Sequence, residues 1–434
     1  MGASTQKKTR QTARSAGTDR KTNAQLKELK KEKQEKVKWI VIAAVIVLFF
    51  GFVFYLNSGA FYRNLNGITV SYPANEALGI DAGEMSFSVA ECNYAYSTQY
   101  MNVVSSYGDY VSIIGLNTQQ PLDEQQCTMF RPEGLAEEDS YTWHDYFTES
   151  TRKYLTQLAV MTAYAEKQGM VLEEADYASI DENIASFDEA KEYGYASADK
   201  FVAGNYGRGS NLKVVRSMLE IQQLATKAQQ SIYDGYEFTA AELKAEYEAH
   251  KDTYDVIGYD FYLVEAKADE TADDAAEAEP TYSEEALKAA KATADEILAK
   301  MLPEEPAEGA EPAEAMSLEA ALKEVVGADA KLTSEEKAGS ELNEAISEWL
   351  LDSGRVENDA AALEADNGAY VVVFKSRDNN QHKTDESGDM NYCDYIADGL
   401  LRSEKLEAWN NDVLTPASEA ATIDTGFGAR YIKR

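Results

Sequence analysis

The feature that most constrains this chain is an apolar run near its N-terminus, WIVIAAVIVLFFGFVFYL at residues 39–56, which contains no charged side chain. As a helix rising about 1.5 Å per residue, a run of this length spans roughly 27 Å. That is close to the roughly 30 Å hydrocarbon core of a bilayer. Trp39 and Tyr55 stand near its ends, where amphipathic aromatic rings favour the membrane interfaces. Neither face of the run is polar, so the sequence predicts a single transmembrane helix.

Charge divides the chain at this run. Residues 1–38 hold twelve Lys and Arg against four Asp and Glu, a net charge of +8. The remaining chain holds 29 basic against 72 acidic residues, a net charge of −43. Basic flanks of membrane helices stay in the cytoplasm. We therefore expect a single-pass protein of the cell membrane, with a cytoplasmic basic tail (1–38) and an extracytoplasmic C-terminal region.

The same run also has a feature of a cleaved signal peptide, because the small residues Ser58, Gly59 and Ala60 follow it. The apolar run is longer than a usual signal core, and the tail before it is long. These two properties favour a retained anchor over cleavage after Ala60. No cysteine directly follows the run, which disfavours a lipid anchor.

The acidic composition excludes some classes of function. A region with a net charge of −43 does not bind nucleic acid by counterion release, which requires Lys and Arg. The three cysteines, Cys92, Cys127 and Cys393, are an odd number, so at least one lacks an intrachain partner, and their spacing does not indicate a pairing. With so few cysteines, an apolar core must hold the outer region, which is long enough for two domains.

Residues 86–250 are predicted to form a mostly α-helical domain rich in tyrosine, after a linker at 57–85. Thr239 and Glu242 have the spacing of a capping box, which predicts a helix from there to about His250. Helical spacing aligns a stripe of apolar residues within 211–233: Met218, Ile221, Ala225, Ala228 and Ile232.

Residues 254–378 change pattern and are predicted to form a small α/β domain. VIGYDFYLV (256–264) and GAYVVVFKSR (368–377) are β-rich segments, and 283–301 has the pattern of a helix. Alternation within the first segment places four side chains on one face: Ile257, Tyr259, Phe261 and Leu263. The fold class is therefore α+β.

Two acidic, low-complexity stretches interrupt this domain, at 266–282 and 302–316. They are too polar to bury an apolar surface, so we expect disordered insertions. Thr333 and Glu336 form a second capping-box pattern, which predicts a helix start. A last helix is predicted near 391–413. The sequence leaves open whether the C-terminal segment, 379–434, packs back on the helical domain.

In its order of elements, the chain resembles the SurA/PrsA-type foldases, a family that includes membrane-anchored members in Gram-positive, Clostridia-like bacteria. The stretches that carry the resemblance are SVAECNYAY (88–96), TWHDYF (142–147), NYGRGSNLKVVRSMLE (205–220) and TAAELKAEYEAHKDTYDVIGYDFYLVEAK (239–267). In that family a helical chaperone domain is interrupted or followed by a parvulin-type peptidyl-prolyl isomerase domain. The resemblance covers about 86–413, and a tyrosine in the lead helix, here Tyr247, is typical of the junction.

The departures from the family pattern concern the isomerase site. Active parvulins usually carry a histidine on the first strand and another on the last strand, and the matching positions here are Phe261 and Tyr370. The glycine-rich loop of the family has no clear counterpart; the nearest stretch is KAGSELNEA (337–345). Because X–Pro isomerisation crosses a barrier of roughly 18–20 kcal/mol, a pocket that lowers it needs placed polar groups. The resemblance therefore implies a degenerate parvulin-like domain without catalytic residues.

Few residues in the chain suit covalent or metal chemistry. The three histidines are His144, His250 and His382. His144 stands beside Asp145 but is predicted to be a surface or packing residue and not half of an acid/base pair, because helix neighbours point in different directions. The glycines of AGNYGRGS do not match a phosphate-cradling Gly-x-Gly-x-x-Gly and predict only a turn. We therefore expect no cofactor and no metal site.

Aromatic residues of the helical domain are the candidate peptide-binding residues, because amphipathic rings suit adaptable apolar contacts. They are Tyr94, Tyr96, Tyr100, Trp143, Tyr146 and Phe147. The alternative is that each of these residues, taken singly, packs in the core between the helices and binds no peptide.

These observations support a membrane-tethered chaperone or foldase that binds newly exported, unfolded polypeptides, without isomerase activity. One alternative is an active peptidyl-prolyl isomerase with an altered pocket. Another is a structural scaffold of a cell-envelope complex. The sequence does not indicate the clients or the oligomeric state.

Overall fold

The computed structural model describes residues 36–433, except 137, 193, 269–279, 303–315, 381, 385–387 and 389. The chain forms two compact units. The first contains the chain up to Ile232 and again from Ala408, and the second is Tyr233–Glu407. Most of the predicted basic tail and of the two predicted acidic insertions lies outside the described residues.

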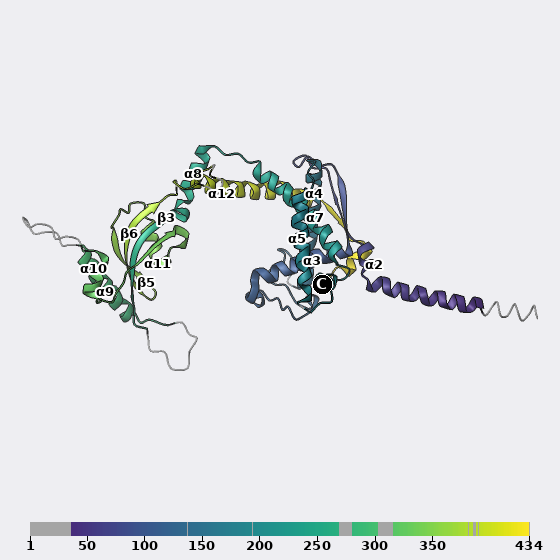
Figure 1. Ribbon diagram of the computed structural model, residues 1–434, viewed down its shortest axis with the longest axis horizontal. Coiled ribbons are helices and arrows are strands. Elements are labelled where there is room, and N and C mark those ends of the chain that lie inside the picture. Colours follow the sequence, from purple (N-terminus) through teal and green to yellow (C-terminus); the bar gives the residue numbers. More distant parts are fainter. Residues whose placement is uncertain are drawn as a thin grey trace, which may run out of the picture. The chain divides into compact units, whose positions relative to one another are not determined.

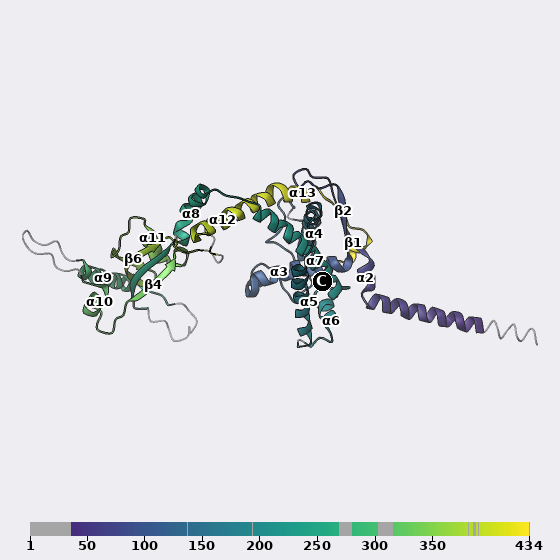
Figure 2. The same cartoon turned by 45° about the horizontal axis from the view of Figure 1, so that its top comes forward.

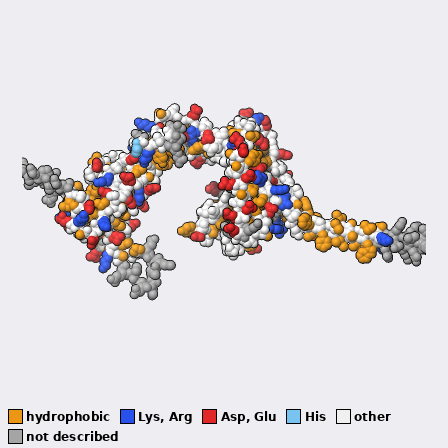
Figure 3. Space-filling model, in the orientation of Figure 1, with side chains coloured by type: hydrophobic (Ala, Val, Ile, Leu, Met, Phe, Trp, Pro, Cys, Tyr) orange, Lys and Arg blue, Asp and Glu red, His pale blue; other side chains and the backbone are white. Residues whose placement is uncertain are grey.

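One helix among the described residues is long and apolar enough to cross a membrane. It runs over Lys36–Asn57, has a mean hydropathy of 2.8 in its most apolar window, and none of that window is buried. Figure 3 shows the hydrophobic side chains along it. The expectation of one long apolar helix near the N-terminus is confirmed.

The segment predicted as a linker, 57–85, is ordered structure that belongs to the first unit. It contains α2 (Ala60–Asn64), β1 (Asn66–Tyr72) and the start of β2 (Gly83–Ser88). The linker interpretation was wrong, because β1 pairs with β2 and with a strand near the C-terminus. Little in the sequence indicates this pairing, since β1 is short. Ile68 and Val70 of β1 are buried in the core of the unit.

Five helices form the rest of this part of the unit, and the first two begin with capping boxes. At the start of α3 the Ser88 hydroxyl accepts a hydrogen bond from the Glu91 amide, and at the start of α4 the Thr142 hydroxyl accepts one from the Asp145 amide. The predicted stripe near 211–233 is confirmed, since Met218, Ala225 and Ala228 are buried in α7. The five helices are α3 (Val89–Tyr107), α4 (Trp143–Lys167), α5 (Glu174–Ala185), α6 (Ala198–Asn205) and α7 (Leu212–Asp234).

The C-terminal residues complete the first unit. A π-helical turn (Asn410–Leu414) leads into α13 (Thr415–Glu419), which lies against α4 (Figure 2). β7 (Thr422–Asp424) then pairs antiparallel with β1, giving the sheet order β2-β1-β7. A last turn, Phe427–Tyr431, leads to Ile432, which is buried in the same core as β1. The chain therefore closes its first unit with its last residues, the point that the sequence left open.

The second unit contains a four-stranded antiparallel sheet of order β4-β3-β6-β5. α9 and α10 cover one face, where Val371 and Val373 are buried, and α11 covers the other, where Val372 and Phe374 are buried (Figure 1). The elements are α8 (Ala240–Tyr254), β3 (Val256–Glu265), α9 (Glu284–Met301), α10 (Leu318–Val325), β4 (Thr333–Ala338), α11 (Glu344–Leu351), β5 (Ala360–Ala365), β6 (Gly368–Asp378) and α12 (Tyr392–Trp409). The predicted face of β3 is confirmed, because Ile257 and Tyr259 lie in the core beneath α11, with Phe261 and Leu263 packed against it.

The second predicted capping box, at Thr333 and Glu336, is wrong. These residues belong to strand β4, which pairs with β3 and places Glu335 opposite Tyr259. The Tyr259 hydroxyl donates a hydrogen bond of 2.6 Å to Glu335. Cross-strand pairing satisfies the backbone groups that a helix would otherwise use, so the local pattern is overridden by the sheet.

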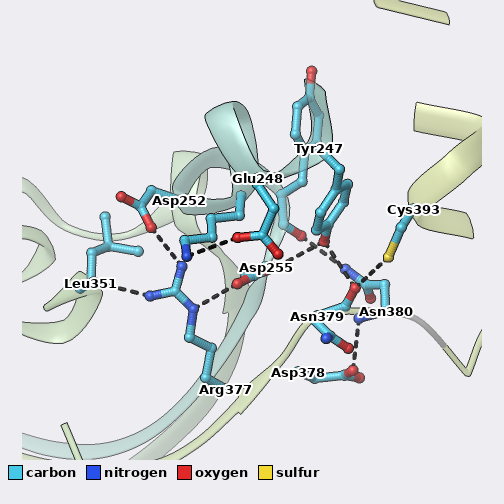
Figure 4. A network of polar contacts seen from close by, with 12 residues as sticks. Tyr247, Glu248, Asp252, Asp255, Leu351, Arg377, Asp378, Asn379, Asn380 and Cys393 are labelled. Carbon is cyan, nitrogen blue, oxygen red and sulfur yellow. Dashed lines mark hydrogen bonds and ion pairs between the residues drawn. The ribbon is translucent and has the colours of Figure 1, made fainter. Parts of the chain in front are cut away.

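A network of polar contacts ties α8 to the sheet (Figure 4). The buried carboxylate of Asp255 accepts from the Tyr247 hydroxyl at 2.8 Å and from Arg377 Nε at 2.6 Å. The Arg377 guanidinium also donates to Asp252 and to the Leu351 carbonyl. Burial, and then the hydrogen bond with Asp255, raises the pKa of Tyr247 well above its usual range. Because Asp255 binds side chains from both α8 and β6, this network fixes the direction in which α8 enters β3.

We predict that Gly428→Ala detaches the C-terminal segment from the first unit. A Cβ at Gly428 would lie 1.9 Å from the Asn66 carbonyl oxygen and 2.9 Å from Val89 Cγ2. We expect a loss of about 1–3 kcal/mol in the free energy of unfolding, measured by urea denaturation. Gly399→Ala is the control, since nothing lies within 4 Å of its Cβ and the residue lies inside helix α12, where alanine is accommodated. Equal stability of the two variants would contradict this account of the C-terminus.

Candidate functional site

The predicted aromatic residues gather where α3 passes the first turns of α4. Both capping boxes fix the starts of these helices, so the side chains that follow are held in place. The Trp143 ring stacks on Phe147 with centroids 5.7 Å apart, and its Nε1 donates to the Gly115 carbonyl at 3.1 Å. Tyr96 and Tyr100 of α3 contact the edge of Phe147, with centroids 5.9 and 5.5 Å away.

The structure places five of the six candidate peptide-binding residues in the core of the first unit. Tyr94, Tyr96, Tyr100, Trp143 and Phe147 are at most 7% exposed. Tyr146 is half-buried and stacks on Phe130 at 4.9 Å. The six residues do not form one open aromatic surface; two of them, Tyr96 and Tyr100, also line a cavity.

His144 belongs to the lining of two cavities in the first unit. Its Nδ1 is 2.9 Å from the Tyr96 hydroxyl, and its ring centroid is 5.6 Å from that of Tyr96. The imidazole lines two neighbouring cavities, here named cavity A and cavity B. The sequence predicted a surface or packing role for His144. Its contact with Tyr96 agrees with packing, and its ring also lines both cavities.

Cavity A has a volume of about 560 Å³ and carries charged and unpaired polar groups. Thr148 Oγ1 and Arg152 Nε, from two of its lining residues, are buried atoms without a hydrogen-bond partner among the described residues. Such atoms cost free energy unless a ligand or water meets them. The lining residues are Ile68, Tyr141, His144, Asp145, Thr148, Glu149, Thr151, Arg152, Thr425, Ala429 and Ile432.

Two titrating groups in the wall of cavity A are coupled. The Tyr141 hydroxyl donates to Glu149 at 3.0 Å. Burial, and then this bond, raises the pKa of Tyr141 above its usual range. The hydrogen bond from Lys153 lowers the pKa of the Glu149 carboxyl, with the Tyr141 bond acting in the same direction. At neutral pH the wall therefore presents a neutral phenol and a carboxylate.

Cavity B has a volume of about 520 Å³ and combines aromatic edges with cations. Arg208 and Lys433 supply positive charge, Asp123 negative charge, and Pro121 and Leu122 an apolar wall. Its remaining lining residues are Tyr96, Tyr100, Thr118, Gln120 and His144. Both cavities are of a size that accepts side chains or short segments of a ligand.

Sequence reasoning missed the parts of both cavities that the C-terminal segment contributes. Thr425, Ala429 and Ile432 line cavity A, and Lys433 lines cavity B. The Lys433 amide donates to Asn93 Oδ1 at 2.8 Å, which holds the end of the chain beside α3. No local pattern marks these residues, since only the pairing of β7 with β1 brings them to the site.

The described residues offer little for covalent or metal chemistry. No group of three His, Cys, Asp or Glu that could hold a metal occurs among them. Cys92, Cys127 and Cys393 are all free and buried. Burial raises the pKa of each thiol, so none is set up as a nucleophile.

In the second unit, the positions matched to the parvulin histidines lie on adjacent central strands. Phe261 on β3 and Tyr370 on β6 have ring centroids 5.7 Å apart. Asn343 Nδ2 donates to the Tyr370 hydroxyl at 3.4 Å. A cavity of about 480 Å³ opens beside Tyr370, lined also by Asn343, Glu344, Ala345, Glu364, Ala365, Asp366 and Asn367. Acidic and aromatic groups, rather than imidazoles, occupy this face.

No family model matches the chain, and no curated protein matches it. Among solved structures it is similar to one from Campylobacter jejuni, where PEB4 and Cj1289 are structurally related SurA-like chaperones. The identity is 12%, the match covers 65% of this chain and 86% of that one, and the TM-score is 0.21. It is also similar to PrsA from Bacillus subtilis, at 14% identity over 65% of this chain and 88% of that one, with a TM-score of 0.20. TM-scores this low carry no argument about function.

We predict that replacing Phe147 by alanine lowers the free energy of unfolding far more than replacing His144 by alanine. Phe147→Ala removes a fully buried ring and is expected to cost about 3–5 kcal/mol in the free energy of unfolding. His144→Ala removes one hydrogen bond at a cavity wall and is expected to cost about 1 kcal/mol. Thermal and urea unfolding measure both values. A small cost for Phe147→Ala would contradict its assignment to the core.

Proposed function

We propose that this protein is a membrane-tethered extracytoplasmic chaperone of SurA/PrsA type, which binds unfolded, newly exported polypeptides without isomerase activity. The observation that carries the proposal is the division of the chain into two units, one of which is inserted within the other. A largely helical unit is interrupted by an α/β unit and is completed by the last 27 residues, Ala408–Arg434. An interrupted helical domain is the layout that the sequence resemblance implied for these foldases.

Cavities A and B are the proposed binding site for client segments. They share His144 and together present aromatic edges, apolar residues and both signs of charge. A site of this mixed chemistry accepts varied side chains without demanding one sequence. Arg152 adds a positive charge and Asp145 and Glu149 add negative charges to the lining of cavity A, so charged client side chains of either sign have a partner there. Binding then rests on transient contacts and requires no cofactor.

The membrane anchor gives such binding its location. Helix Lys36–Asn57 ends two residues before α2, which begins the first unit, so the proposed site stays near the bilayer. A tether of this kind raises the effective concentration of the chaperone around emerging chains. The charge difference between residues 1–38 and the rest of the chain sets the proposed orientation, with the helical unit outside.

We predict that the full-length protein in lipid nanodiscs suppresses aggregation of a chemically unfolded client, measured by light scattering. Replacing Leu122 and His144 by alanine removes contacts from cavity B and is expected to raise the concentration needed about fivefold. That factor corresponds to roughly 1 kcal/mol of lost binding free energy.

The matched control for this experiment is Val356→Ala with His382→Ala, an apolar residue and a histidine in the second unit. Val356 is 63% exposed, and the His382 side chain is 68% exposed. The control is expected to act like the unchanged protein. If the unchanged protein fails to suppress aggregation at any stoichiometry, the proposed function is wrong. If both double variants act alike, the cavities are not the site.

We predict that the protein does not accelerate proline isomerisation. The residues at the parvulin histidine positions are Phe261 and Tyr370, and Tyr370 is only 9% exposed. Neither residue supplies the imidazole that active parvulins usually carry at these positions, so we expect the barrier of roughly 18–20 kcal/mol to stay unlowered. A protease-coupled assay on a proline peptide measures the rate. A rate above the uncatalysed background would establish the isomerase alternative.

A further inference from the structure

The end of the apolar helix opens onto a third cavity in the first unit, here named the juxtamembrane pocket. It has a volume of about 770 Å³. Its lining residues are Leu56, Asn57, Ser58, Gly59, Tyr62, Arg63, Ser197, Asp199, Lys200, Ala203, Arg208, Gly209, Ser210 and Asn211. The last residues of the apolar helix, the second half of α2, the start of α6 and the turn before α7 therefore meet at one place.

The pocket is basic within a strongly acidic protein. It contains three cations, Arg63, Lys200 and Arg208, and one carboxylate, Asp199. Asp199 Oδ1 already accepts a hydrogen bond from the Leu212 amide at 2.9 Å. None of the three cations has a salt bridge to a carboxylate among the described residues. In a region with 29 basic and 72 acidic residues, a cluster of three cations without acidic partners favours binding of an anionic ligand.

The backbone of the turn holds two of these cations in position. Gly207 and Gly209 have φ of +85° and +90°, a conformation that favours glycine, and Arg208 lies between them. The Arg208 carbonyl accepts from Asn93 Nδ2 at 2.9 Å. Arg63 donates to the Gly209 carbonyl at 3.1 Å and to the Ser58 carbonyl at 3.0 Å, which joins α2 to this turn.

Aromatic rings surround the same end of the unit. Phe61 lies between Tyr55 and Tyr431, with ring centroids 6.4 and 5.8 Å away. Phe427 is 57% exposed and lies under the Arg430 guanidinium at 3.7 Å. Aromatic rings and basic side chains beside the end of an apolar helix are the usual composition of a membrane interface.

We infer that the juxtamembrane pocket binds the phosphate of an anionic phospholipid headgroup in the outer leaflet. This inference rests on the membrane anchor of the proposed function but not on chaperone activity. A helix of 22 residues is about 33 Å long, so its Leu56–Asn57 end lies at headgroup depth when the helix crosses the hydrocarbon core. Guanidinium groups match phosphate oxygens with paired donors, and the lysine adds a point charge. The bound lipid would fix the first unit against the bilayer.

The test uses the full-length protein in nanodiscs of zwitterionic lipid, with or without added phosphatidylglycerol. Hydrogen exchange of the backbone amides in 197–211 reports occupancy of the pocket. We expect about tenfold slower exchange in the anionic discs, decreasing when salt screens the charges. Lys200→Gln with Arg208→Gln is expected to abolish this difference. Recovery of the protein with the discs tests the anchor separately.

Lys153→Gln with Lys167→Gln is the matched control, since it removes the same charge from side chains that pair with Glu149 and Asp81 and do not line the pocket. It is expected to keep the response to anionic lipid. Equal exchange in both kinds of disc would overturn the inference, as would loss of the response in the control. Inorganic phosphate added to zwitterionic discs must not reproduce the protection; if it does, the site binds free anions. Thermal unfolding shows whether each variant is folded.

Discussion

The antiparallel pairing of β7 with β1 is the interaction on which the rest of the first unit depends. It joins residues 422–424 to residues 69–71, which are about 350 positions apart in the sequence. The same return buries Ile432 in the core and brings the Lys433 amide to Asn93 on α3. Closing so long a loop costs conformational entropy, and buried contacts at its end offset that cost. Without this return, cavity A and cavity B would each lack part of their walls.

The distribution of charge sets one region of the first unit apart from the rest of the chain. The chain as a whole has a net charge of −35, yet the pocket beside the apolar helix contains Arg63, Lys200 and Arg208 with a single acidic residue. Cavity B shares Arg208 with that pocket and adds Lys433. A surface that is otherwise negative repels anionic membranes and keeps the protein soluble. In the proposed lipid-bound state, the local basic site would determine which part of the unit approaches the bilayer.

Several elements were predictable because their signals are local. The apolar run at 39–56, the capping box at Thr239 and the stripe of α7 each depend on residues a few positions apart. The β-rich segments that became β3 and β6 also carried alternating or continuous apolar patterns. Where local signals were weak or ambiguous, prediction failed. β1 was taken as linker, and Thr333 with Glu336 was taken as a helix start although β4 pairs with β3.

The sequence by itself determined that one long apolar helix precedes a large acidic region, because hydropathy and charge are additive properties of neighbouring residues. It also indicated a tyrosine-rich helical part followed by an α/β part. Only the tertiary structure decided which aromatic rings are buried and which line a cavity, as Phe147 and Tyr100 illustrate. It alone decided that the chain's last residues complete its first unit. Those outcomes depend on contacts between residues hundreds of positions apart, which no local pattern records.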